Sequence, residues 1–276
     1  MDAMTVDKLR MITNSFYLNH FDSFSQTRTE PWDGWYRCID IVKQRLLGEG
    51  SPFHGEPGAR ETFTVFDLGC GNLRFKTFLE SAFPAIDIAY FALDNCEDIV
   101  PVHADDSRQL IAVQFQNLDA VKVLASGEDL NDQITAPLCD LTVSFGFMHH
   151  VPLESNREKV LASLIDQTRP GGLVIVSFWQ FMGDDDMACK AQLAHERARE
   201  ELDLPDLDEN DFILGWKQID GAYRYCHSFV DDEIEQLLAS TAGKATLVER
   251  FVSDGRTGDL NTYIVLQVDE PSGGGI

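Results

Sequence analysis

Glycines and carboxylates follow two apolar segments of this chain in a pattern that could bind a nucleoside. The first segment, TVFDLGCGNLRF at 64–75, contains Asp67 and places Gly69 and Gly71 in the turn behind it. Because glycine has no Cβ, the backbone of such a turn can approach a ligand closely. Asp94 ends the second segment, YFALD, 23 residues after Gly71. An acid roughly 20 residues past the glycines can accept hydrogen bonds from a ribose diol.

A third carboxylate, Asp119, follows the next apolar segment in QFQNLDA and could accept a hydrogen bond from the exocyclic amine of an adenine. No Walker-type lysine follows the glycine turn, so a triphosphate is not expected. Arg74 stands where the third glycine of a dinucleotide-binding G-x-G-x-x-G motif would be. A pyrophosphate needs close approach of the backbone at that point, so a dinucleotide-dependent reductase is kept only as an alternative.

Alternating strands and helices are predicted to position these residues. This alternation predicts an α/β fold with a doubly wound, seven-stranded, mostly parallel sheet that is covered on both faces. RPGG at 169–172 is predicted to end one helix, and SDGRTGDLN at 253–261 to form a hairpin that makes the last strand antiparallel. The predicted strands are 63–68, 88–93, 112–117, 140–145, 173–178, 246–252 and 262–267, and the predicted helices are 5–22, 33–47, 73–82, 97–101, 119–126, 154–168 and 231–240.

Three regions are predicted along the chain. Residues 1–50 form an N-terminal helical lid, and residues 60–268 form the domain that carries the sheet. The segment 180–226 is too long for a plain connection and is predicted to be an inserted cap. Residues 269–276, which end in PSGGGI, are predicted to be a disordered tail. Because ligands bind at the carboxyl ends of strands in such sheets, the three acids are expected around one cleft.

The chain is strongly acidic, with 46 acidic against 22 basic residues and a net charge of −24. Such a charge repels nucleic acid and anionic membranes unless the basic residues gather on one face. Residues 1–60 carry seven bases and eight acids, whereas 184–211 carry eleven acids and three bases. The acidic segment is interpreted as a solvated helix and loop.

Six cysteines are spread along the chain, and the closest pair is 26 residues apart. No C-x-x-C spacing occurs, so no metal site is predicted, and the thiols are expected to be buried and reduced. The first residues lack the apolar region of a signal peptide, and no apolar run approaches the roughly 18 residues of a membrane helix. We expect a cytoplasmic protein with no membrane contact.

Histidines are the candidate catalytic residues. His149 and His150 follow the fourth predicted strand in FGFMHH, and as neighbours only one of them is expected to face the cleft as a substrate contact or general base. His227, in YRYCHSF, is the second candidate. Arg224 and Tyr225 beside it could hold an anionic group, or they could simply begin a helix.

As a set, these segments resemble a known family. VFDLGCGN, ALD, NLDA, FGFMHHV and RPGG are similar to the successive motifs of class I S-adenosylmethionine-dependent methyltransferases, over about residues 60–180. The resemblance implies S-adenosylmethionine as the cofactor. It implies that Asp67, Gly69 and Gly71 line the methionine moiety, that Asp94 holds the ribose and that Asp119 binds the adenine.

Further residues gain a role from this resemblance. The backbone at Phe145 and Gly146 is expected to meet the methionine amine. Arg28, in SQTR, could bind the cofactor carboxylate, because a guanidinium suits planar anions, or it could be an exposed loop arginine. Trp32 and Trp35 could cover the cofactor, or they could anchor a helix in the core.

A narrower resemblance concerns the methyl acceptor. HFDSFSQTRTEPWDGW, FMHH and LGWK…YRYCHSF are similar to signatures of the tRNA wobble-uridine carboxymethyl methyltransferases, which esterify a carboxymethyl group on uridine. The chain departs from that group in GCGNLR, where the group usually has GCGNGK, and in its acidity. The acceptor of an in-line methyl transfer could thus be a tRNA carboxylate, bound directly or through a basic partner subunit, or a small metabolite. A catalytically silent cofactor-binding subunit that serves a partner is the alternative.

Overall fold

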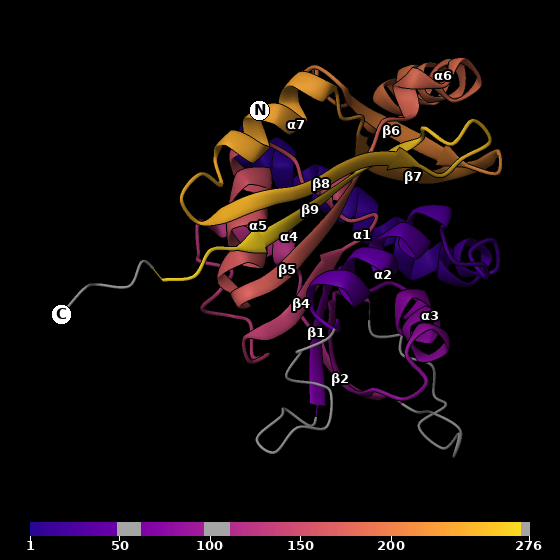
Figure 1. The fold of residues 1–276 in the computed structure, drawn as a ribbon. Coiled ribbons are helices and arrows are strands. Elements are labelled where there is room, and N and C mark those ends of the chain that lie inside the picture. Colours follow the sequence, from indigo (N-terminus) through magenta and orange to yellow (C-terminus); the bar gives the residue numbers. More distant parts are fainter. Residues whose placement is uncertain (49–61, 97–110, 272–276) are drawn as a thin grey trace.

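Seven strands form the main sheet of the computed structural model, which describes residues 1–48, 62–96 and 111–271 (Figure 1). The strands lie in the order β3-β2-β1-β4-β5-β9-β8. Neighbours pair in parallel from β3 to β5, whereas β9 is antiparallel to both β5 and β8. The predicted α/β sheet and its antiparallel last strand are confirmed. The strands are β1 (Thr62–Leu68), β2 (Asp87–Asp94), β3 (Ala112–Asn117), β4 (Cys139–Ser144), β5 (Thr168–Trp179), β8 (Ala245–Ser253) and β9 (Asn261–Val268).

Helices cover both faces of this sheet because successive side chains of a strand point to opposite sides. Along β1, Val65 packs in the apolar cluster of α2 and α3, whereas Phe66 packs in the cluster of α4, α5 and α7. Every residue of β4 is buried, as expected for a central parallel strand. The helices are α2 (Asp33–Arg45), α3 (Arg74–Ala82), α4 (Ala120–Ser126), α5 (Glu154–Asp166) and α7 (Asp231–Ala239).

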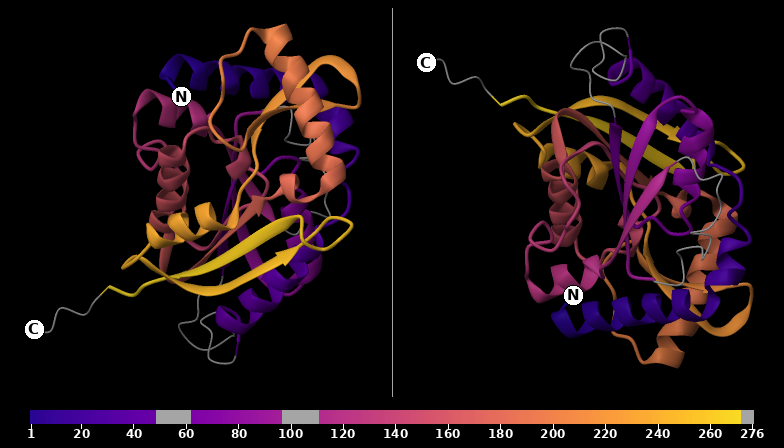
Figure 2. Two further views of the ribbon diagram at one scale, coloured as in Figure 1. Left: turned by 90° about the horizontal axis from the view of Figure 1, so that it is seen from above. Right: turned by 90° about the horizontal axis from the view of Figure 1, so that it is seen from below.

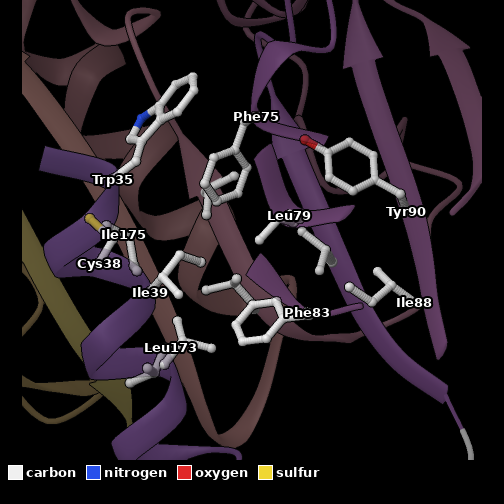
Figure 3. Packing of buried hydrophobic residues seen from close by; sticks show 14 of the residues in the cluster. Trp35, Cys38, Ile39, Phe75, Leu79, Phe83, Ile88, Tyr90, Leu173 and Ile175 are labelled. Carbon is white, nitrogen blue, oxygen red and sulfur yellow. The ribbon is translucent and has the colours of Figure 1, made fainter. Parts of the chain in front are cut away.

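Aromatic and aliphatic side chains join α2 to α3 over the sheet (Figure 3). The ring centroids of Trp35 and Phe75 lie 5.2 Å apart in an edge-to-face arrangement. Leu79 is fully buried in the same cluster. Burying a side chain of this size contributes about 1.5–3 kcal/mol. The packing also holds Trp35 in place beside the cavity described below.

Helix α1 (Ala3–Ser25) packs against a second, two-stranded sheet rather than against the main one (Figure 2). This sheet pairs β6 (Asp211–Trp216) with β7 (Ile219–His227) in antiparallel fashion. Leu9 of α1 is fully buried in one cluster with Ile213 and Tyr225 of the hairpin. The remaining elements are α6 (Asp185–Leu202), which lies on β6, and the 3-10 helices η2 (Met148–His150) and η3 (Phe181–Gly183).

The structure corrects the sequence prediction at the start of β5. Helix α5 already ends at Asp166, and RPGG lies inside the strand instead of ending the helix. Arg169 fastens this segment to the sheet, since its Nη1 lies 3.0 Å from Oδ1 of Asp140 and 2.8 Å from Oγ1 of Thr64. Gly171 has φ +75°, a backbone conformation that only glycine adopts easily, so the strand continues through an irregular stretch.

Other predictions fall partly or wholly outside the described residues. The helix at 97–101 lies outside them, as do residues 272–276 of the tail. Asp269, at the start of the predicted tail, donates its backbone N–H to the carbonyl of Lys244 at 2.9 Å. Five of the six cysteines are buried thiols, and Cys189 is exposed. No helix in residues 1–48, 62–96 or 111–271 has the length and apolar character needed to cross a membrane.

Helix α1 offers a matched pair of leucines that tests its packing on the hairpin. Leu9 has an exposed fraction of 0%, whereas Leu18 of the same helix is 68% exposed. We expect Leu9→Ala to lower the free energy of unfolding by about 2–5 kcal/mol, because it leaves a cavity between α1 and the hairpin. Leu18→Ala should change it by less than about 0.5 kcal/mol. Urea denaturation of both variants measures this, and equal losses would contradict the packing.

Candidate functional site

A cavity of about 610 Å³ opens at the carboxyl ends of the central strands, and α1 and the segment 27–32 line its opposite wall. The predicted site residues come from different strand ends but meet here, with the exception of His227. Those that line the cavity are Arg28, Asp67, Gly69, Gly71, Asp94, Asp119, Phe145, His149 and His150.

The two glycines of the turn after β1 have different surroundings. Gly69 has φ +76°, and a Cβ there would lie 2.6 Å from the Cβ of Phe147. Gly71 has φ +50° but open space where a Cβ would be. The first glycine is therefore required by packing, whereas the second leaves the backbone accessible from the cavity.

Asp94 is fixed at the tip of β2 by backbone donors. Its Oδ2 accepts from the N–H of Gly71 at 3.0 Å, and its Oδ1 accepts from Asn95 at 2.8 Å and from Cys96 at 3.3 Å. Burial raises the pKa of this carboxyl, while the backbone donors oppose the shift. A carboxylate with two oxygens can accept about four hydrogen bonds, so capacity for a ligand hydroxyl remains.

Asp67 lies deeper in the same region, with an exposed fraction of 2%. The hydroxyl of Tyr90 donates to its Oδ2. Burial raises the pKa of Asp67 to about 7, although the hydrogen bond from Tyr90 acts against this. A cation bound nearby would favour its ionised form.

Asp119 joins the third strand end to helix α1. It is the N-cap of α4, where its Oδ1 accepts from the N–H of Lys122 at 2.9 Å. Its Oδ2 accepts from Nη1 of Arg10 and Nδ2 of Asn14, both at 2.8 Å. The carboxylate that the sequence suggested for adenine thus also fastens α1 over this end of the cavity.

Both His149 and His150 line the cavity, contrary to the expectation that only one of them would face it. They lie in η2, and successive side chains of a 3-10 turn are about 120° apart, not on opposite sides as in a strand. Their ring centroids are 4.2 Å apart. The rule that neighbouring side chains point to opposite sides holds for a strand and does not hold for this turn.

Hydrogen bonds define the tautomer of His150. Its Nδ1 lies 2.8 Å from the carbonyl oxygen of Tyr225, which can only accept, so Nδ1 carries the proton. Its Nε2 then accepts from the hydroxyl of Tyr17 at 2.8 Å. Burial lowers the pKa of His150 to about 3, and burial also lowers the pKa of His149 well below its usual value. Both rings are neutral, and Nδ1 of His149 has no partner among the described residues.

His227 lies outside the cavity lining, in a buried group of charged residues. Its Nδ1 is 2.7 Å from Oδ1 of Asp211, and its Nε2 is 2.6 Å from Oε2 of Glu233. Arg157 binds the other oxygen of Glu233 at 2.6 Å. His227 therefore ties β7 to β6 and α7, and we leave it out of the proposed catalytic set.

Two arginines lie over one group of aromatic rings on the α1 side of the cavity. The guanidinium carbon of Arg28 is 3.5 Å from the centre of the Phe24 ring, and that of Arg224 is 5.8 Å from it. Both are 5.7 Å from the Trp216 ring. Arg224 belongs to β7 and not to a helix N-terminus, because the residues around it pair with β6.

A third arginine, Arg74, lies over separate aromatic rings. Its guanidinium carbon is 4.9 Å from the ring of Trp35 and 5.1 Å from that of Trp32. Its Nη1 donates to the carbonyl of Glu30 at 2.8 Å. In the sequence, Arg74 stands out only because it occupies the place of the third glycine. Its position in the first turn of α3, directly behind the glycine turn, was the signal that could have revealed it.

None of these three arginines forms an ion pair with a carboxylate within the described part of the chain. Burial lowers the pKa of Arg28 and of Arg74 to about 10, and both remain protonated at neutral pH. Buried polar atoms rarely lack a partner in folded proteins, so those that do can mark a ligand site. Four such atoms belong to residues that line the cavity: Nε1 of Trp35, Nε of Arg74, Nδ1 of His149 and Nη1 of Arg224.

One group of side chains has the composition of a metal site. Ligand atoms of His149, His150 and Cys226 lie within 4.8 Å of one another. However, both nitrogens of His150 are already hydrogen-bonded, and the cations of Arg28 and Arg224 lower the pKa of both histidines. The local field opposes a metal cation, and we assign none.

Comparison with solved structures identifies the fold. A methyltransferase of Methanosarcina mazei described as S-adenosylmethionine-dependent is 14% identical, with a TM-score of 0.52 over 76% of this chain and 95% of that one. DesVI of Streptomyces venezuelae is 16% identical, with a TM-score of 0.51 over 91% of this chain and 97% of that one. The chain has the class I fold of S-adenosylmethionine-dependent methyltransferases.

Sequence comparison finds a more distant likeness. The chain is 21% identical over 121 residues to the tRNA (carboxymethyluridine(34)-5-O)-methyltransferase of Arabidopsis thaliana. The match includes 44% of this chain but only 25% of that protein, so the chain spans about a quarter of its relative. No family model matches the sequence.

The group around His227 predicts a pH-dependent stability. Burial disfavours the imidazolium, but the hydrogen bonds to Asp211 and Glu233 outweigh it and raise the pKa of His227 above its usual value. The stabilisation is fully present below the unfolded pKa of about 6.5 and is lost as the pH rises through the folded pKa. We expect His227→Gln to lose more stability at pH 6 than at pH 9 relative to the unsubstituted protein.

Urea midpoints of both proteins at the two pH values measure this difference. Cys189→Ser, a substitution at an exposed position, is the control, and its urea midpoints should equal those of the unsubstituted protein at both pH values. A His227→Gln loss that is the same at both pH values would contradict the charged state assigned to His227.

Proposed function

We propose that this protein is an S-adenosylmethionine-dependent methyltransferase that esterifies a carboxylate of its acceptor by in-line methyl transfer. The observation that carries the proposal is the combination of unpaired guanidinium groups with neutral histidines in one cavity of this fold. Guanidinium groups bind an anionic acceptor, whereas neutral histidines of low basicity add little to a reaction that needs a base.

The residues at the strand ends fit the cofactor. Gly71 offers accessible backbone, and Asp94 keeps acceptor capacity for a ribose hydroxyl. The carboxyl of Asp67 lies beside the turn and can ionise when a cationic amino group binds. Asp119 bounds the far end next to the apolar side chain of Val121, where an adenine ring would lie. When bound, the cofactor supplies an electrophilic methyl group on a positively charged sulfur.

Arg28 and Arg224 are proposed to hold the acceptor carboxylate. Their guanidinium groups share the rings of Phe24 and Trp216, and those rings keep the two like charges in fixed positions. An arginine can bind a carboxylate through two parallel hydrogen bonds. Such binding orients one oxygen toward the methyl group, and positioning of this kind supplies much of the rate in a displacement reaction.

A carboxylate acceptor also explains the state of the histidines. The acceptor oxygen is already ionised at neutral pH, so it attacks the methyl carbon and the electron pair of the broken S–C bond stays on sulfur. No proton moves in this step. An amine or phenol acceptor would instead call for a base, and the lowered pKa values of His149 and His150 make them poor ones.

Two carriers of this carboxylate are considered, a tRNA carboxymethyluridine and a small metabolite. The likeness to the Arabidopsis thaliana protein favours the tRNA. The net charge of −24 works against direct binding of a polyanion, and a basic partner subunit would overcome this repulsion. Titration of the isolated chain with tRNA at about 0.15 M salt separates the carriers, because submicromolar affinity would support direct recognition of tRNA.

The cofactor assignment predicts the effect of substituting Asp94. Asp94→Asn removes the charge that accepts the ribose hydrogen bonds and should weaken S-adenosylhomocysteine binding by about 1.5–3 kcal/mol. Asp232→Asn, at an exposed position on α7, is the matched control and should leave binding unchanged. Calorimetry measures both, and unaltered affinity in Asp94→Asn would remove the cofactor assignment.

The acceptor assignment predicts a selective effect at Arg224. Arg224→Gln should raise the KM for a carboxylate acceptor by an amount equivalent to about 1.5–3 kcal/mol, with little change in cofactor affinity. Arg197→Gln, at an exposed position on α6, is the control. Steady-state methyl transfer to an acceptor carboxylate and to its amide tests the proposal. Equal turnover of the two, or cofactor binding without any transfer, would contradict it, and the latter would favour the silent-subunit alternative.

A further inference from the structure

The end of the cavity beside α2 and α3 holds two unpartnered donors that the acceptor site does not use. Trp35 has an exposed fraction of 2%, and its Nε1–H has no partner among the described residues. Nε of Arg74 is likewise buried and unpartnered. Both residues line the same cavity, and the Arg74 guanidinium carbon lies 4.9 Å from the centre of the Trp35 ring. Two buried donors in one wall, one of them on a cation, are complementary to a carboxylate.

Aromatic packing fixes both donors before any ligand binds. The Arg74 guanidinium lies over the rings of Trp32 and Trp35, and its Nη1 is bound to the carbonyl of Glu30. Trp35 is itself held by Phe75, as Figure 3 shows. Because these contacts restrict the guanidinium, little side-chain entropy is lost when an anion binds.

Asp254, the acid whose charge acts on Arg74, is bound by other groups. Asp254 also lines the cavity, but its Oδ1 accepts from the N–H of Gly34 at 2.9 Å. Its Oδ2 accepts from Asn261 at 2.7 Å and from the hydroxyl of Tyr263. These bonds hold the Asp254 carboxylate against α2 and β9, and it forms no ion pair with Arg74 within the described residues.

The position of Arg74 in the sheet indicates which anion it binds. A Cβ on Gly146 would lie 3.0 Å from the ring of Trp32, so the ring that carries Arg74 touches the end of β4. Asp94 and Asp119 lie at the ends of β2 and β3, on the other side of β1. A nucleoside held by these two acids would extend its amino-acid end across β1 toward Arg74.

We infer that Arg74 and the indole N–H of Trp35 bind the carboxylate of the cofactor's amino-acid end. Arg28, which the sequence suggested for this carboxylate, lies instead with Arg224 over Phe24 and Trp216. The inference rests on the proposed function, since it names residues for the same cofactor. It assigns the two anions of the reaction to different arginines: the cofactor carboxylate to Arg74, and the acceptor carboxylate to Arg28 and Arg224.

The test compares two ligands that differ in one group, S-adenosylhomocysteine and its decarboxylated analogue. Calorimetry with the full chain should show that the unsubstituted protein prefers S-adenosylhomocysteine. Arg74→Gln should weaken S-adenosylhomocysteine binding by about 10- to 100-fold while leaving the analogue within about twofold, so the preference disappears. Arg28→Gln is the matched control and should keep the preference.

Trp35→Phe tests the indole N–H separately from Arg74, because it keeps an aromatic ring at this position and removes the N–H donor. It should weaken S-adenosylhomocysteine binding selectively, by about 3- to 10-fold. A preference for the carboxylate that survives in Arg74→Gln, or one that is lost in Arg28→Gln, would overturn the assignment. The predicted loss in Arg74→Gln together with no methyl transfer to any carboxylate would support the inference and contradict the proposed function.

Discussion

The cavity contains three guanidinium groups that have no carboxylate partner within the described residues. Burying a charge without a counter-charge is costly, and the surrounding structure offsets this cost only in part. Aromatic faces lie under each guanidinium, and Arg74 also donates to a backbone carbonyl. This arrangement makes the site complementary to anions before any anion enters. The architecture around the cavity can be understood as the scaffold that keeps these charges apart and fixed.

Each part of that scaffold comes from a different region of the chain. Helices α2 and α3 hold Arg74 and its two tryptophans through the apolar cluster on one face of the sheet. The β6–β7 hairpin brings in Arg224, and α1 supplies the rings of Phe16 and Phe24 next to it. Helix α1 is itself fastened by Asp119, which binds Arg10 and Asn14, and by the buried Leu9. The site therefore depends on docking of α1 and the hairpin as much as on the central sheet.

The molecule as a whole is strongly negative, whereas Arg28, Arg74 and Arg224 place positive charge in the cavity wall. The chain carries a net charge of −24, and the segment 184–211 contributes eleven acids. Inside the cavity, burial lowers the pKa of Arg28 and Arg74 without removing their charge, and the two histidines stay neutral. A small anion that reaches Arg28 and Arg224 meets positive charge there, whereas a long polyanion must also approach the acidic exterior.

Local sequence determined the sheet and the strand-end residues. Apolar runs alternating with helical spacing predicted all seven strands of the main sheet, and their carboxyl ends brought Asp67, Asp94 and Asp119 to one cavity. These features follow from the hydrophobic periodicity of each segment and from the alternation of strands and helices along the chain. In a parallel sheet, these two properties place the strand ends at one edge. The sequence could not show that both His149 and His150 face the cavity, because a 3-10 turn after β4 is not encoded in hydrophobic periodicity. Nor could it separate His227 from the site or distinguish Arg74 from Arg28, since these positions are decided by contacts between residues far apart in the chain.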